Sequence, residues 1–146
     1  MHPRVLQFVA NRRPSTPRRR GAAVVEFAIV APVFFLVMLG MIEFGRMAMV
    51  QQVITNAARE GARIAVLDNS TKARVTNKVK DYLKSSNITS ATINVTPDPP
   101  SSAAYDESVT VTVSVPFNDV SWLPAPFFFG GKSLQAESVM RRETVE

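Results

Sequence analysis

The hydrophobic pattern begins with an apolar run from Ala22 to Ile42 that contains one carboxylate, Glu26, and no other charge. At about 1.5 Å of rise per helical residue, this run of 21 residues can cross a hydrocarbon core of roughly 30 Å. A segment at that depth must satisfy its backbone hydrogen bonds internally, so the run is predicted to be a transmembrane helix. Pro32 removes one backbone donor and is expected to kink it.

Beyond Ile42 the apolar residues thin to one stripe at helical spacing, which predicts that the same helix continues as an amphipathic helix. Glu43 and Arg46 are expected to mark the exit from the membrane, with Phe44 as an interfacial aromatic residue. Turn-forming residues at 68–70 predict the end of a helix of roughly 45 residues. The stripe consists of Met47, Val50, Ile54, Ala57, Gly61 and Ile64.

A second, shorter helix is predicted after this turn. Ser70 or Thr71 can cap its first turn, and Asn87 is a plausible stop. Its apolar face consists of Val75, Val79, Tyr82 and Leu83.

After the second helix, the spacing of apolar residues changes from a helical period of 3.6 to a strand period of 2. This change predicts strands over 92–96, 109–115 and 133–142. Pro116 ends the second of these, in which valines alternate with hydroxyl side chains. We expect about three antiparallel strands whose apolar face packs on the outer half of the long helix, an α+β arrangement. In the irregular connection 117–132, Trp122 is expected in the core. Phe127–Phe129 suits either a core plug or a partner-binding patch.

The charge distribution separates a basic head from the rest of the chain. Six of the 17 basic residues precede Gly21, whereas none of the 12 acidic residues do. Such a head is typical of an orientation signal that keeps the N-terminus in the cytoplasm and places the rest outside. The head contains prolines rather than aromatic or helical organisation, so it is expected to be disordered and no nucleic-acid role is expected. The absence of cysteine excludes a disulfide framework.

These patterns divide the chain into three parts. Residues 1–21 form a basic cytoplasmic leader, residues 22–42 a transmembrane helix, and residues 43–146 an extracytoplasmic α+β domain.

Catalysis finds little support in the sequence. His2 is the only histidine and lies in the basic head, which excludes a histidine-based triad or metal site. There is no phosphate-binding glycine loop, and Asp98, Asp106, Glu107 and Asp119 share no periodicity. No enzymatic activity, cofactor or metal ion is expected.

The carboxylate of Glu26 lies about one turn inside the expected lipid helix, where a charge is costly. It becomes useful if the chain is cut after Gly21, because Ala22 would then carry an ammonium group. Glu26 of a neighbouring subunit could pair with that group and set the axial register between subunits. The alternative is that Glu26 reaches the headgroup level and has no specific partner.

Three sequence blocks, in this order, resemble the TadE-like family, the minor pseudopilins of tight-adherence (Flp) pilus systems. The first is Arg20-Gly21-Ala-Ala-Val-Val-Glu26-Phe27-Ala-Ile-Val-Ala-Pro32. The second is Ile42-Glu43-Phe44-Gly45-Arg46, and the third is Thr55-Asn56-Ala57-Ala58-Arg59-Glu60-Gly61-Ala62-Arg63. A weaker echo lies in the closing residues, around Ser133-Leu134 and Met140-Arg141-Arg142-Glu143.

The resemblance implies a pilin-like subunit of the bacterial inner membrane that has one span and an outer domain. The mature subunit is expected to join or prime a thin pilus. It implies cleavage between Gly21 and Ala22 by a prepilin peptidase, with Glu26 and Phe27 needed for recognition or assembly. The implied partners are that peptidase, other pilin or pseudopilin subunits, the inner-membrane assembly platform and the lipid bilayer. The third block is either a set of ordinary surface residues or a face that docks on partner helices.

Two other readings stay open at this point. In the first, an uncleaved single-span protein presents its outer domain as an interaction module. In the second, an ordinary signal peptidase releases a secreted enzyme. The second is the weaker, because an ordinary signal peptide has a shorter apolar core followed by a small-residue cleavage site.

Overall fold

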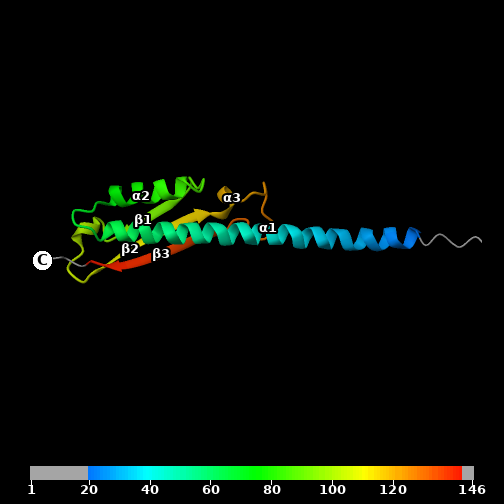
Figure 1. Cartoon of the computed structure of the whole chain (residues 1–146), viewed down its shortest axis with the longest axis horizontal. Helices are drawn as coiled ribbons and strands as arrows, with labels where there is room; N and C mark the ends of the chain where they lie inside the picture. Colours follow the sequence, from blue (N-terminus) through cyan, green and yellow to red (C-terminus); the bar gives the residue numbers. More distant parts are fainter. Residues whose placement is uncertain (1–19, 143–146) are drawn as a thin grey trace, which may run out of the picture. The chain divides into compact units, whose positions relative to one another are not determined.

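A computed structural model of the chain describes residues 20–142. Its elements in chain order are α1 (Arg20–Ala65), α2 (Lys72–Lys84), β1 (Thr92–Thr96), the short 3₁₀ helix η1 (Pro100–Ser102), β2 (Ser108–Pro116), α3 (Phe117–Val120) and β3 (Ser133–Arg141) (Figure 1). The chain forms two units, Met1–Leu36 and Val37–Glu146. The predicted disordered head lies outside the described residues except for Arg20, which begins α1.

Within the first unit, α1 is an apolar helix whose side chains are almost all exposed among the described residues. From Ala22 to Leu36 every residue is exposed except the half-buried Ala31. The helix contains a stretch long and apolar enough to cross a membrane. Pro32 lies inside α1, which runs as one helix to Ala65, so a kink at Pro32 stays a prediction.

The second unit contains the predicted three-stranded antiparallel sheet, in the order β1-β2-β3. Val113, at the centre of β2, faces Ile93 of β1 and Ala136 of β3. The four valines of β2 are fully buried while the hydroxyl residues between them are half-buried. This alternation confirms a sheet that packs on one face and is open on the other.

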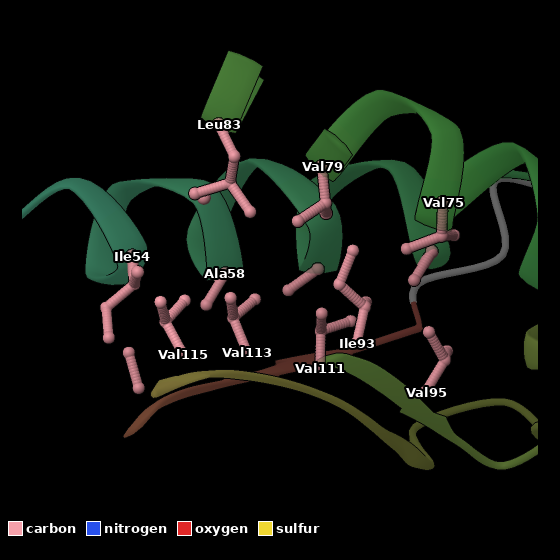
Figure 2. Close-up of a cluster of buried hydrophobic side chains, with 14 of the residues drawn as sticks. Ile54, Ala58, Val75, Val79, Leu83, Ile93, Val95, Val111, Val113 and Val115 are labelled. Carbon is pink, nitrogen blue, oxygen red and sulfur yellow. The ribbon is translucent and has the colours of Figure 1, made fainter. Parts of the chain in front are cut away.

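The buried face of the sheet packs against two helices. Figure 2 shows valines of β2 and two β1 side chains pointing toward α1 and α2, and three α2 side chains pointing back. Ile54, which belongs to the predicted apolar stripe, and Ala58, which does not, are the α1 residues labelled in this core. Together with the sheet and α2 side chains they form the hydrophobic core of the second unit. The labelled sheet and α2 side chains are Val111, Val113, Val115, Ile93, Val95, Val75, Val79 and Leu83.

Gly61 marks a close approach between α1 and both α2 and β2. A methyl group built on Gly61 would lie 2.6 Å from Cγ2 of Val79 in α2 and 3.1 Å from Cγ1 of Val111 in β2. Both distances are shorter than carbon–carbon van der Waals contact. A hydrogen in place of a side chain therefore lets α2 and β2 approach the same turn of α1.

The ends of α2 follow the predicted chemistry. Thr71 is the N-cap, and its hydroxyl accepts a hydrogen bond from the backbone N–H of Arg74 at 3.3 Å. The helix ends at Lys84, and Asn87 has a positive φ of 61°, which ends the segment in a turn. Tyr82, predicted on the apolar face, is 37% exposed and lies at the edge of that face.

Arg142, which directly follows β3, connects three parts of the second unit. Its Nη1 donates to the carbonyl oxygens of Ser101 and Ala103 at 2.6 and 2.9 Å. Its Nη2 lies 3.2 Å from Oδ1 of Asp68, in the turn between α1 and α2. The end of β3 is thereby held against η1 and the α1–α2 turn.

Candidate functional site

The predicted processing residues lie together on the first turns of α1. Gly21, Ala22, Glu26 and Phe27 are all exposed, and a methyl group built on Gly21 would meet nothing within 4 Å. Glu26 is the single ionisable side chain of α1 between Arg20 and Glu43. The arrangement leaves the backbone between Gly21 and Ala22 and the Glu26 carboxylate open to another protein.

Glu43, expected at the exit from the membrane, is buried, with 1% of its surface exposed. Its carboxylate accepts three backbone hydrogen bonds from the loop between α3 and β3. The N–H of Phe127 donates to Oε1 at 2.6 Å, and those of Phe128 and Phe129 donate to Oε2 at 2.9 and 3.2 Å. A residue of α1 thus holds a loop that is more than 80 residues away in sequence (Figure 1).

The hydrogen bonds explain how a carboxylate is kept charged in a buried place. Burial raises the pKa of Glu43, and the three backbone N–H groups lower it by more, so its pKa lies below the ordinary value. Charge-assisted hydrogen bonds of this kind are about twice as strong as neutral ones. Glu43 therefore acts as an anionic clamp for the loop.

Arg46, one turn further along α1, holds the start of the same loop. Its Nε donates to the carbonyl oxygen of Val120 at 2.7 Å, and its guanidinium carbon lies 5.0 Å from the ring centre of Trp122. Trp122 is 64% exposed, so the expectation that it belongs to the core is wrong. Its ring stacks on a cation of α1 instead of entering the interior.

The three aromatic residues Phe127–Phe129 do not share one role, although the sequence predicted either a core plug or a partner-binding patch for the whole run. Phe129 is half-buried and packs edge-on against the buried Phe117 of α3, with ring centres 5.7 Å apart. Phe127 and Phe128 are exposed. The Phe128 ring lies against α1, since a methyl group built on Gly40 would be 3.3 Å from its Cε2. One ring plugs the core, and two face outward.

The third sequence block, residues 55–63, takes no part in the hydrogen bonds by which Glu43 and Arg46 hold the loop. Arg63 donates to both carboxylate oxygens of Glu60 at 2.9 and 2.8 Å, which lowers the pKa of Glu60. Arg59 is exposed, Asn56 is half-buried, and Gly61 lies in the core contact described above. The Glu60–Arg63 pair fits the ordinary surface reading, and a docking role for this face stays a prediction.

Within the second block, Glu43 and Arg46 face the domain while Phe44 and Gly45 are exposed between them. One sequence signal could have revealed the clamp: Glu43, Met47, Val50 and Ile54 follow one another at helical spacing. Glu43 therefore lies in line with the buried stripe, where a charge requires a partner.

The described part of the chain, residues 20–142, contains no group of three or more His, Cys, Asp or Glu side chains placed to hold a metal ion. What the arrangement offers is an exposed apolar helix with one carboxylate, and a loop clamped onto the helix by two charged side chains.

Comparison with known proteins gives one match, to the family model described as TadE-like protein, over residues 21–63. This segment of the chain is similar to the TadE-like family. The TadE-like segment begins at Gly21 and includes Glu26, the clamp residues Glu43 and Arg46, and Gly61. The TadE-like family is structural and Tad pilus-associated, and the match supports a Tad pilus-associated protein. No curated protein and no solved structure matches the chain.

Proposed function

We propose that this TadE-like chain is a minor pseudopilin of a Flp (tight-adherence) pilus system. The arginine-rich head keeps the N-terminus in the cytoplasm, residues 22–42 span the inner membrane, and residues 43–146 lie outside. A prepilin peptidase cuts between Gly21 and Ala22, and the mature subunit joins other pilin or pseudopilin subunits on the inner-membrane assembly platform. The proposal is supported most by an exposed Glu26 in a TadE-like segment that begins at Gly21.

The physical reason for Glu26 is its distance from the new terminus. Glu26 lies four positions after Ala22, which corresponds to about 6 Å along the helix axis. If the Ala22 ammonium of one subunit meets Glu26 of its neighbour, the two helices are staggered by about that amount. In lipid the attraction is poorly screened, so the pair can select one register among side-by-side apolar helices.

The side chains around Glu26 on α1 are exposed, which fits a helix that contacts lipid or other subunits rather than the rest of its own chain. Phe27 is 71% exposed, and Val24, Val25 and Ile29 are at least 60% exposed. In the membrane these side chains contact lipid or the helices of other subunits. An uncleaved anchor would need the same apolar length but would gain nothing from the carboxylate.

Co-expression with and without a prepilin peptidase tests the processing step. We expect intact mass to show the full chain without the enzyme and a chain that begins at Ala22 with it. A chain that stays full length beside an active peptidase would favour the alternative reading, an uncleaved single-span interaction module.

Substitution of Glu26 tests the assembly step. Glu26→Ala is expected to leave a stable membrane protein and to reduce piliation, because the ammonium of the neighbour loses its partner. Glu137→Ala removes an exposed carboxylate from β3 and serves as the matched control, with piliation unchanged. Normal piliation in the Glu26→Ala strain would refute the register role.

A further inference from the structure

The loop between α3 and β3 presents an uncharged aromatic surface. The eleven residues from Ser121 to Gly131 include no Asp, Glu, Lys, Arg or His. Trp122, Phe127 and Phe128 are 64%, 69% and 52% exposed. Large apolar side chains gathered on an exposed surface generally mark a contact with a membrane or another protein.

Three contacts fix the position of this loop along α1. The ring of Phe128 lies against Gly40, the backbone at residues 127–129 is bound by Glu43, and Trp122 stacks on Arg46. Gly40 to Arg46 covers about 9 Å of helix axis at 1.5 Å per residue. Gly40 lies inside the proposed span 22–42, so the loop reaches back to the level of its last turn.

The order of side chains along this distance follows the polarity of a bilayer surface. Phe128, purely apolar, is nearest the hydrocarbon end, and Trp122 is level with the charged Arg46 outside the span. Tryptophan has an apolar ring with a polar N–H, which suits the boundary between hydrocarbon and headgroups. The exposed aromatic rings therefore lie at the depth at which membrane proteins place their interfacial aromatic residues.

We propose that the loop 121–131 is an interfacial anchor that inserts Trp122, Phe127 and Phe128 into the phospholipid surface beside the span. Backbone N–H groups without hydrogen-bond partners are costly near lipid, and Glu43 accepts hydrogen bonds from three such groups of the loop. The anchor gives the outer domain a second attachment to the membrane and restricts its tilt and rotation about α1. The inference rests on the proposed function in one respect, that residues 22–42 cross the membrane.

Trp122 is the only tryptophan of the chain, so its fluorescence reports on the loop directly. The full chain is reconstituted in phosphatidylcholine vesicles, with or without lipids brominated in the upper part of the acyl chain. Flotation after a carbonate wash first shows whether the chain is integrated. We expect an integrated chain in which Trp122 is quenched by brominated lipid and protected from acrylamide in the water.

A matched control moves the probe to the other end of the sheet. Tyr105, 74% exposed, lies just before β2, whose nine residues place its two ends about 27 Å apart. In the double variant Trp122→Phe with Tyr105→Trp, the single tryptophan is expected to be quenched by acrylamide and not by brominated lipid. Phe127→Ser with Phe128→Ser tests the anchor itself and is expected to lower the lipid quenching of Trp122.

The outcomes separate the anchor from the span. An integrated chain whose Trp122 is quenched by acrylamide alone overturns the anchor and leaves the span intact. An integrated chain whose Trp122 is protected from both quenchers overturns it as well, because the loop is then covered by protein. A chain that does not float with the vesicles overturns the span and the anchor together.

Discussion

Gly61 offers the sharpest test of how the helices and the sheet of the second unit pack together. It lies in the middle of α1, where glycine normally weakens a helix by about 1 kcal/mol relative to alanine. Yet a methyl group at this position would lie 2.6 Å from Val79 Cγ2 and 3.1 Å from Val111 Cγ1. The contact with Val79 is hard to relieve, because a β-branched side chain in a helix has essentially one χ1 rotamer.

The expected magnitude follows from two opposing terms. Gly61→Ala gains about 1 kcal/mol of helix propensity and loses about 1–3 kcal/mol by overpacking a buried contact. The net effect is a destabilisation of up to about 2 kcal/mol. For an outer domain of about a hundred residues, each kcal/mol lowers the melting temperature by roughly 4–8 °C.

Gly45→Ala is the matched control, because Gly45 also lies inside α1 but a methyl group there meets nothing within 4 Å. It gains the propensity term alone, so the difference between the two variants isolates the packing term of about 1–3 kcal/mol. Thermal unfolding of the full chain in mild detergent, followed by circular dichroism, measures both variants.

Repeating Gly61→Ala in a chain that already carries Val79→Ala tests whether the contact with Val79 causes the destabilisation. In a Val79→Ala chain the obstructing Cγ2 is absent, so Gly61→Ala should cost less there than in the unmodified chain. The packing argument is wrong if Gly61→Ala stabilises the chain as much as Gly45→Ala does, or if its effect is the same in both backgrounds.

Three other predictions concern the loop clamp and the core. Glu43→Gln places an amide N–H₂ where the loop needs an acceptor, so the loop should be held less firmly. Chymotrypsin should then cut the 122–128 segment faster, whereas Glu137→Gln serves as an unaffected control. Because the folded pKa of Glu43 is lowered, its stabilisation is fully present above the ordinary value of 4.5 and is lost as the pH falls through the folded pKa. Trp122 fluorescence should therefore change below pH 4.5 in the native chain, and this transition should be missing from Glu43→Gln. Val113→Ala, at a fully buried strand position, should cost about 2 kcal/mol or more in the same unfolding assay, whereas Val139→Ala, at a half-exposed one, should cost little.

The helices and strands could be predicted because each has an apolar period of its own. The stripe from Met47 to Ile64 predicted which face of α1 is buried, and the alternating valines predicted β2 and its open face. These signals depend on neighbours a few positions apart, which is the range in which sequence period determines structure. The packing of the sheet on α1 then followed, because neither surface can bury itself alone.

The helical spacing of Glu43 with the buried stripe indicates a carboxylate that needs a partner, but the partner itself could not be predicted, because the loop is far away in sequence and has no period. A glutamate after an apolar run ordinarily marks a membrane exit, and only the loop reveals that Glu43 receives three N–H groups. Trp122 was placed in the core on hydrophobicity, but a cation on α1 offered its ring a partner at the surface. The short helix α3 was missed for a similar reason, since four residues are too few to show a helical repeat.

The N-terminus of the chain isolated from its native membrane tests the central claim most directly. Intact mass measurement of the extracted protein should give a chain that begins at Ala22, with the basic head removed and Glu26 retained near the new ammonium group. A mature chain that begins at Met1 in cells that still make pili would contradict the proposed processing and the role given to Glu26.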